Sequence, residues 1–323
     1  MHSGTKAGFF RTFILSITAC ALMAVCGGLS DQPDAKMDSL VTAEWLNQHL
    51  DDPNLVVLDC TVMMELLGDG SVRVVSGQTN YDSGHIPTAG FADLMGDLSD
   101  NDNSLQFAVP APEQFASAMG ALGVGDDSRV VLYDGSNTGW AARVWWMLRW
   151  VGFDRAALLD GGLAAWNELG LPLSTEPAGR PASHLTFALR PELIADRDEV
   201  FASLENDAVS LIDAMPAAHY SGEMVMYDRP GHIPGALNVP ASALLDDSGR
   251  FRSNDELASM IESDRNVRSI TYCGGGISAS TDAFILTRLG FTDVAVYAAS
   301  LQEWAADPSN PMEIVSSQDQ ISR

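Results

Sequence analysis

The segment Arg129-Val-Val-Leu-Tyr-Asp134 returns in the second half of the chain as Arg268-Ser-Ile-Thr-Tyr-Cys273. Each of the two segments follows a Gly-His-Ile-Pro tetrapeptide, which begins at Gly84 in the first half and at Gly231 in the second. A tryptophan then follows each segment after nearly the same interval. Because repetition on this scale is typical of duplicated structural units, the chain is predicted to hold two copies of one domain.

In each copy, short apolar runs alternate with helical patterns. Leu55-Val-Val-Leu58 and Val209-Ser-Leu-Ile212 are too short and too uniformly apolar for amphipathic helices, so they predict buried strands, as do the two segments above. Helical periodicity covers residues 113–122, 140–150, 254–261 and 279–289. Strands that alternate with helices form right-handed crossovers, so the prediction is an α/β fold in which each copy has a mainly parallel sheet flanked by helices.

The first thirty residues have the pattern of an export signal. Two basic residues, Lys6 and Arg11, precede an apolar run over residues 12–25, which is short for a membrane span. Cys20 and Cys26 both lie where a lipid could be attached after cleavage. The protein is therefore expected to be exported, either to the periplasm or as a lipoprotein with a membrane tether on Cys20 or Cys26.

The remainder of the chain divides at a stretch rich in proline, glycine and small polar residues. This stretch, residues 174–183, is predicted to be the linker. The N-terminal copy is expected over residues 38–173 and the C-terminal copy over 184–313, with a polar tail over 314–323.

Composition limits the class of protein and its partners. Of 323 residues, 46% are hydrophobic and 19% charged, which is typical of packed globular domains, and the formal net charge is −25. Binding to nucleic acid or to an anionic membrane surface depends on basic groups, so the charge argues against both partners. A small anionic substrate is compatible with it, because a few oriented amides and one arginine make a local positive site.

Two cysteines, Cys60 and Cys273, remain in the folded part of the chain. Neither has the spacing of a metal site, so no metal is expected. Cys273 ends a predicted strand and begins the loop Cys273-Gly-Gly-Gly-Ile-Ser278, which leads into a predicted helix. The glycine run permits backbone angles closed to other residues, so successive amides can converge on the sulfur and, with the helix N-terminus, stabilise a thiolate. Cys60 lacks such a loop and is interpreted as core filling.

The candidate site therefore consists of a nucleophile and the loop that surrounds it. Cys273 is the predicted nucleophile. The predicted substrate-binding residues of the loop are Gly274, Gly275, Gly276, Ile277 and Ser278. Phosphate-ester hydrolysis would also use a loop cysteine, but it needs an arginine six positions later to clamp the phosphate, and that position is Ala279.

At this point the sequence resembles a family. The tandem repeat, the two tetrapeptides, the six-residue loop and the ending Leu301-Gln-Glu-Trp-Ala-Ala-Asp-Pro308 are similar to those of two-domain rhodanese-type sulfurtransferases, which use thiosulfate or 3-mercaptopyruvate. The resemblance covers about residues 38–313. It implies two tandem rhodanese-like domains, a catalytically inactive N-terminal copy, a persulfide on Cys273, and an active site near the interface of the copies. It implies no metal or organic cofactor.

The repeat also allows the two copies to be compared with each other. His85 and His232 occur in both copies, although only the second has the thiol, so both are interpreted as parts of a turn that holds the fold. Counting back from the tetrapeptides pairs Asp82 with Arg229. Arg229 occurs only in the copy that has the thiol, so it is predicted to bind the anionic donor. The open alternative is that Arg229 is a solvated loop residue.

The chain departs from the family at one place. Active members carry arginines shortly after the aspartate that ends the first strand, whereas Met215 and His219 follow Asp213 here. His219 is therefore a second candidate for substrate binding. The neutral Gly274 and Gly275 resemble the loops of the mercaptopyruvate type, but the donor remains open between the two.

The expected function is transfer of sulfane sulfur from a small anionic donor through a Cys273 persulfide to a thiophilic acceptor such as cyanide or a thiol. The alternative is a non-catalytic persulfide carrier that has lost donor turnover together with the usual arginine.

Overall fold

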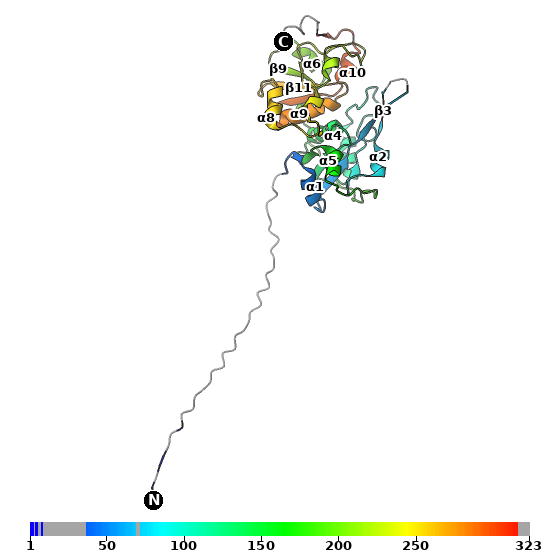
Figure 1. The fold of residues 1–323 in the computed structure, drawn as a ribbon. Coiled ribbons are helices and arrows are strands. Elements are labelled where there is room, and N and C mark those ends of the chain that lie inside the picture. Colours follow the sequence, from blue (N-terminus) through cyan, green and yellow to red (C-terminus); the bar gives the residue numbers. More distant parts are fainter. Residues whose placement is uncertain (3, 6–7, 9–36, 69–71, 316–323) are drawn as a thin grey trace. The chain divides into compact units, whose positions relative to one another are not determined.

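Two five-stranded parallel sheets, one in each half of the chain, confirm the predicted α/β architecture (Figure 1). The computed structural model describes residues 1–2, 4–5, 8, 37–68 and 72–315. The leader with Cys20 and Cys26, and most of the predicted tail, lie outside the described residues. Both copies belong to the unit that starts at Met37.

The N-terminal sheet has the strand order β1-β7-β6-β2-β5. Its strands are β1 (Leu40–Val41), β2 (Leu55–Asp59), β5 (Gly90–Phe91), β6 (Arg129–Tyr133) and β7 (Ala156–Leu159), and all pair in parallel. The helices are α1 (Ala43–His49), α2 (Gln78–Ser83), α3 (Pro112–Ala121), α4 (Gly139–Trp150) and α5 (Gly162–Glu168). An antiparallel hairpin, β3 (Val62–Leu66) and β4 (Val72–Ser76), follows β2.

Alternate residues of each central strand face opposite layers of helices. Val56 and Leu58 of β2 pack in one hydrophobic cluster with side chains of α3 and α4, whereas Leu55 and Val57 pack in a second cluster with side chains of α1 and α5. Because both faces of the strand are covered, an uninterrupted apolar run is stable there, and this is the pattern that predicted the strand.

The C-terminal sheet repeats this arrangement in the order β10-β9-β11-β12-β8. Its strands are β8 (Ile194–Ala195), β9 (Val209–Asp213), β10 (Leu237–Asn238), β11 (Arg268–Tyr272) and β12 (Val294–Tyr297). Its helices are α6 (Arg197–Ser203), α7 (Ala217–Tyr220), α8 (Asn254–Met260), α9 (Ile277–Arg288) and α10 (Ser300–Trp304), with short 3₁₀ turns η1 (Pro191–Leu193) and η2 (Ala241–Leu244). The register of β9 against β11 matches that of β2 against β6, so the halves share one topology.

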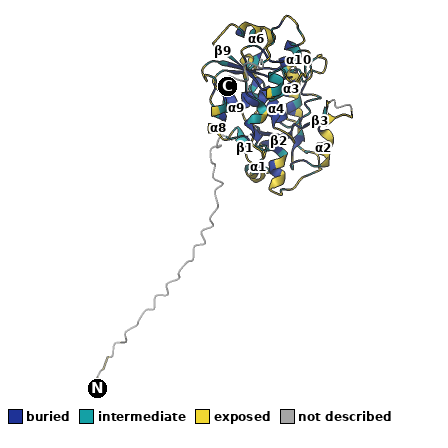
Figure 2. Cartoon of the chain, turned by 45° about the horizontal axis from the view of Figure 1, so that its top comes forward, coloured by how far each residue is buried: buried dark blue, intermediate teal, exposed yellow. Residues whose placement is uncertain are grey.

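Helices α4 and α9 pack against each other where the two domains meet (Figures 1 and 2). The ring of Trp145 on α4 meets that of Phe284 on α9 edge to face, with 4.9 Å between centroids. Side chains of both helices belong to one hydrophobic cluster, which spans both domains. Both helices are buried on several sides, and the buried residues of α9 include the polar Ser280, Thr281 and Asp282.

The segment between the domains is bound to the N-terminal domain. Ser174 exchanges two backbone hydrogen bonds with His85, and the Ser183 amide donates to the Gly120 carbonyl. The contact continues to Arg190, whose amide donates to the Trp150 carbonyl. The first strand of the C-terminal sheet is β8, which begins at Ile194.

The two repeated histidines have the same structural role, as their retention in both copies predicted. The ring of His85 stacks on Tyr81 and that of His232 stacks on Tyr220, and in each case Nδ1 lies 2.8 Å from the carbonyl oxygen of the tyrosine. Their backbones pair with Ser174 and Glu313, respectively. Each histidine therefore fixes the segment that leaves its domain. In residues 37–68 and 72–315, no helix is long and apolar enough to cross a membrane.

Candidate active site

Cys273 lies between β11 and α9, at the sheet edge where parallel α/β folds bind ligands. The residue is 3% exposed. The Gly276 amide donates to its Sγ over 3.1 Å, and the Cys273 amide donates to Ser300 Oγ over 3.1 Å. An amide of the glycine loop thus points at the sulfur, the kind of contact that the sequence predicted.

The three glycines of the loop lie in different surroundings. Of the three, all of which the structure describes, only Gly276 has a positive φ, of 81°. A Cβ on Gly276 would lie 2.7 Å from the Ala298 carbonyl oxygen, and a Cβ on Gly274 would overlap the Tyr227 hydroxyl. At Gly275 it would meet the Gln302 side-chain amide at 3.2 Å and the Gln106 carbonyl oxygen at 3.9 Å. Of the backbone angles that the glycine run permits, the left-handed ones are therefore used at Gly276.

Helix α10 and the N-terminal domain hold this loop from outside. The amides of Leu301 and Gln302 donate to the carbonyls of Cys273 and Gly274, over 3.1 and 3.0 Å. The Gln302 side chain in turn exchanges two hydrogen bonds of 3.0 Å with the backbone of Gln106 in the other domain. These contacts fix the loop before any donor binds.

The last two predicted loop residues face the domain boundary. Ile277 packs with its Cγ2 against Gly139 at the start of α4. Ser278 lines a cavity of about 110 Å³ together with residues of both domains, Gly139 and Pro216 among them. The active-site loop therefore borders the interface of the copies, as the family resemblance implied.

The corresponding loop of the N-terminal copy holds its own anion. Asp134 Oδ1 accepts hydrogen bonds from the amides of Ser136 and Thr138, and Oδ2 accepts one from the Ala141 amide, over 2.9 to 3.1 Å. Thr138 and Gly276 directly precede α4 and α9, and both have left-handed backbone angles. The loop amides of this fold are thus arranged to bind a negative charge. In the N-terminal copy they bind the carboxylate of Asp134, and in the C-terminal copy the corresponding loop surrounds the thiol of Cys273.

Cys60 fills the core, as its sequence context predicted. It is fully buried in the cluster that spans both domains. Burial raises the pKa of the Cys60 thiol well above its usual value, and the nearby carboxylates of Asp59 and Asp134 raise it further. A thiol in such surroundings is inert as a nucleophile.

Two segments, residues 42–169 and 196–307, match the family of the Rhodanese-like domain. The chain belongs to the rhodanese-like family. The 3-mercaptopyruvate sulfurtransferase of Escherichia coli (strain K12) is 35% identical over 284 residues, which cover 85% of this chain and 98% of that relative. The Thiosulfate/3-mercaptopyruvate sulfurtransferase 1 of Arabidopsis thaliana is 31% identical over 317 residues, which cover 90% of this chain and 82% of the relative.

Solved structures agree with this assignment. SseA from Escherichia coli, a 3-mercaptopyruvate sulfotransferase with the rhodanese fold, superposes with a TM-score of 0.72 at 33% identity and covers 82% of this chain and 99% of its own. The protein is therefore a tandem rhodanese-like sulfurtransferase.

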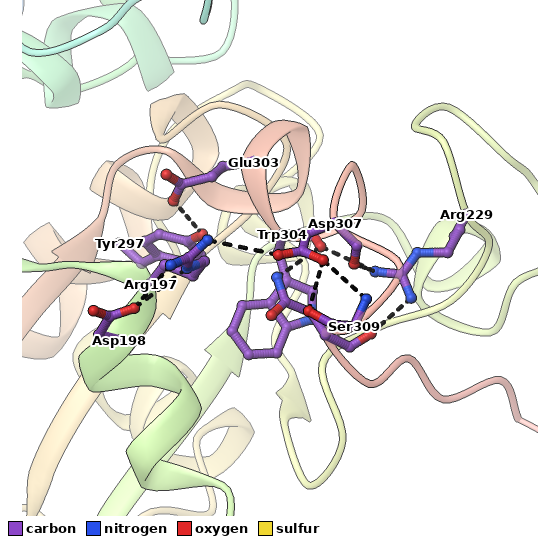
Figure 3. Close-up of polar contacts among 9 residues, drawn as sticks. Arg197, Asp198, Arg229, Tyr297, Glu303, Trp304, Asp307 and Ser309 are labelled. Atoms are coloured by element: carbon purple, nitrogen blue, oxygen red, sulfur yellow. Dashed lines mark hydrogen bonds and ion pairs between the residues drawn. The ribbon is translucent and has the colours of Figure 1, made fainter.

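Arg229 has a structural role in the C-terminal rhodanese-like domain. Its guanidinium donates four hydrogen bonds of 2.7 to 3.0 Å, all to backbone carbonyls at the end of α10 and in the turn that follows it. Figure 3 shows Arg229 beside Trp304 and Asp307, two of the four acceptor residues. The acceptors are the carbonyl oxygens of Trp304, Ala305, Asp307 and Asn310. Since four of the five N–H donors of the side chain are occupied in this way, Arg229 holds the turn, and donor binding by Arg229 stays a prediction.

An insertion explains why the comparison of the copies failed here. Tyr81 precedes its histidine partner by four residues, whereas Tyr220 precedes its partner by twelve. The C-terminal copy thus has eight additional residues between the two rings, and counting back from His232 pairs Arg229 with the wrong residue of the first copy.

This inserted segment contributes a residue that the sequence analysis missed. The Tyr227 hydroxyl lies against Gly274 of the active-site loop. Burial raises the pKa of Tyr227 well above its usual value, and the negative charge of Cys273 adds to the shift. Met224, Val225 and Met226 precede it and are exposed. Only the length of the insertion, compared with the first copy, signals this arrangement in the sequence.

His219 lies on α7 and is half-buried. Its Nδ1 is buried and has no hydrogen-bond partner in the described part of the chain. Met215 packs in the hydrophobic core. Donor binding by His219 stays a prediction. Within the described ranges, no group of three or more His, Cys, Asp or Glu side chains is arranged to hold a metal ion.

A second missed residue belongs to the other copy. Arg143 on α4 is 1% exposed, and its Nη1 lies 2.8 Å from the position that a Cβ on Gly276 would take. Sequence comparison within the C-terminal copy cannot find such a residue, because it reaches the loop across the domain interface.

Proposed function

We propose that this sulfurtransferase takes sulfur from 3-mercaptopyruvate, carries it as a persulfide on Cys273 and passes it to a thiol or to cyanide. The observation that carries the proposal is the Gly276 amide bound to Cys273 Sγ, in a loop whose counterpart holds the Asp134 carboxylate. The relatives named above support the choice of donor, because the Escherichia coli protein, matched over nearly its full length, is a 3-mercaptopyruvate sulfurtransferase.

In the first step, the Cys273 thiolate attacks the thiol sulfur of the donor. The S–S bond forms while the C–S bond breaks, and the electron pair of the C–S bond leaves with the carbon as the enolate of pyruvate. The enolate takes up a proton at that carbon. The carbon gains two electrons, and the cysteine sulfur and the donor sulfur each give up one, so the step needs no external oxidant.

In the second step, an acceptor thiolate or cyanide attacks the outer sulfur of the persulfide. The S–S bond breaks, and its electron pair returns to Cys273 as a thiolate. Because Gly276 and Ala279 correspond to the residues whose amides bind Asp134, their N–H groups are placed to hold the negative outer sulfur between the two steps.

Tyr227 is the residue we assign to donor recognition. Its phenol rests on Gly274, beside the thiol, and an O–H group can donate to the carbonyl oxygen on which the enolate charge develops. Thiosulfate has no such oxygen next to a breaking C–S bond. A role of Tyr227 would therefore favour 3-mercaptopyruvate over thiosulfate.

The test is a steady-state comparison of the two donors with cyanide as acceptor, combined with intact mass spectrometry. Cys273→Ser should lose turnover and the mass gain of one sulfur atom, whereas Cys60→Ser should keep both. Higher kcat/KM with thiosulfate would contradict the choice of donor. A carrier would release about one equivalent and stop, so repeated turnover distinguishes the enzyme from the alternative.

The N-terminal domain has a carboxylate in place of the thiol, and we propose that it is catalytically silent. We also propose export, on the pattern of the first thirty residues, with a tether if Cys20 or Cys26 is lipidated. The mass of the N-terminal peptide of the protein isolated from its own cells tests this, because an uncleaved Met1 would contradict export by a cleaved signal.

A further inference from the structure

Arg143 is a buried cation that lacks a full set of partners. Its Nη2 donates to the Phe107 carbonyl over 2.8 Å, and its guanidinium carbon lies 4.8 Å from the ring centroid of Trp146. Its Nη1 is buried and has no hydrogen-bond partner among the described residues. A guanidinium taken out of water in this way is costly unless an anion lies close to it.

The unpaired nitrogen is directed at the active-site loop of the other domain. The short distance from Nη1 to the Cβ position of Gly276 places the guanidinium in contact with the residue whose amide binds Cys273 Sγ. Gly276 has no side chain, so the positive charge approaches the loop as closely as the backbone allows.

Charges around Arg143 identify the anion. In the part of the chain that the structure describes, Arg143 forms no hydrogen bond or ion pair with a carboxylate. Burial lowers the pKa of Arg143 to about 10, and the charge of Cys273 acts in the opposite direction. The side chain therefore remains a cation at neutral pH, and Cys273 is the group of the loop whose charge acts on it.

We propose that Arg143 is the counter-ion of the Cys273 thiolate and of the persulfide anion formed from it. The domain without a thiol thus supplies a positioning residue to the site of the other domain. The inference rests on the proposed function in one respect, that Cys273 is the sulfur carrier. It places the positive charge of the site on α4, in a chain that has Met215 and His219 in place of the family's arginines.

Other charged groups near the loop do not take this role. The titratable groups on the elements packed against it include Asp213 at the end of β9, Tyr227 of the inserted segment, Tyr272 on β11, Asp282 on α9, Tyr297 on β12 and Glu303 on α10. None of them is a cation. The remaining arginines of α4 and α9, Arg149 and Arg288, lie in the last turns of these helices and pair with Asp154 and Asp38.

The experiment measures how fast iodoacetamide modifies Cys273 as a function of pH, read from the masses of the peptides so that the other cysteines are distinguished. For Arg143→Met we expect the midpoint of the pH profile to rise by about 1 pH unit or more, because an opposite charge no longer favours the thiolate. Reactivity at neutral pH should fall about tenfold, and Arg143→Lys should restore most of it.

Arg149→Met is the matched control. Arg149 lies on the same helix and donates to Thr287 Oγ1 of α9, in the other domain, over 3.2 Å. The substitution therefore removes an interdomain contact but leaves the Arg143 guanidinium beside Gly276 in place. Its pH profile should match that of the wild type. An unchanged midpoint in Arg143→Met would overturn the inference, and an equal shift in Arg149→Met would assign the effect to the interface.

If Arg143→Met does not fold, two further measurements decide. Arg143→Gln keeps a donor for the Phe107 carbonyl and should give the same shift. Cys273→Ser leaves the guanidinium without its anion, so it should lose more stability to urea, relative to wild type, at about pH 9 than at about pH 6. An equal loss at both pH values would contradict the ion pair. Alkylation of Cys273 does not require the sulfur donor. If 3-mercaptopyruvate is not a substrate, this is seen separately, as the absence of turnover with it.

Discussion

Gly276 donates its amide to Cys273 Sγ from a left-handed backbone conformation, and the Ala298 carbonyl lies on the side where a side chain would project. The contact that holds the sulfur thus depends on a residue without a Cβ. This relationship leads to the first prediction.

Gly276→Ala should lower kcat/KM by about 100-fold or more, because displacement of the amide removes a donor to the reacting sulfur. The positive φ and the contact at 2.7 Å should also reduce the free energy of unfolding by about 2–4 kcal/mol. Gly249→Ala is the control, since Gly249 has φ of 77° and a Cβ there meets no described atom within 4 Å. It should cost about 1 kcal/mol and leave activity intact. Equal activity losses would contradict the assignment of Gly276.

Tyr227→Phe should reduce kcat/KM for 3-mercaptopyruvate about tenfold while changing that for thiosulfate little, since one hydrogen bond to the developing enolate is lost. The control is Tyr81→Phe, which removes a hydroxyl that donates to the Ala89 carbonyl in the other domain. That variant should lose stability and retain both activities. A Tyr227→Phe enzyme that treats the two donors as the wild type does would remove the phenol from donor recognition.

Arg229→Met should reduce the free energy of unfolding by about 2–4 kcal/mol, because four backbone carbonyls lose a charged donor together. Arg229→Lys should not restore it, since an ammonium cannot span the four acceptors. Urea unfolding checks the stability, and donor titration checks the KM, which should stay within about twofold. A large rise in KM at unchanged stability would place Arg229 in the donor site.

Asp213 should make stability depend on pH. Burial raises its pKa to about 7, against hydrogen bonds from the Met215 amide and the Tyr272 hydroxyl, and its Oδ2 has no hydrogen-bond partner among the residues described. Since the folded protein binds a proton that the unfolded chain releases near pH 4, this contribution to stability is complete below about pH 4 and is lost as the pH rises through about 7.

Asp213→Asn cannot titrate, so its stability relative to wild type should rise by about 4 kcal/mol between about pH 4 and about pH 8. Urea unfolding at the two pH values measures this difference. Asp247→Asn, at an exposed position, serves as the control and should shift both values equally. If the Asp213→Asn difference were the same at both pH values, the carboxyl would be ionised throughout.

Local sequence was sufficient for the two central strands of each sheet and for the thiol. Leu55–Asp59 and Arg129–Tyr133 are strands because apolar runs of this length are stable only between two layers of helices. Cys273 was identified because a strand end, glycines and a helix start are adjacent in the chain, so their geometry is decided by local backbone preferences. The tandem arrangement was also predictable, because the repeated segments can be read directly from the sequence.

Contacts between distant parts of the chain were decided only by the tertiary structure. Arg143 reaches the loop because α4 packs against α9, and no spacing along the sequence expresses that contact. Tyr227 reaches Gly274 through an insertion that also misaligned Arg229, whose charge is used to hold backbone carbonyls. A charged side chain in a sequence shows which interactions it can form, whereas its partner depends on which groups the fold buries beside it.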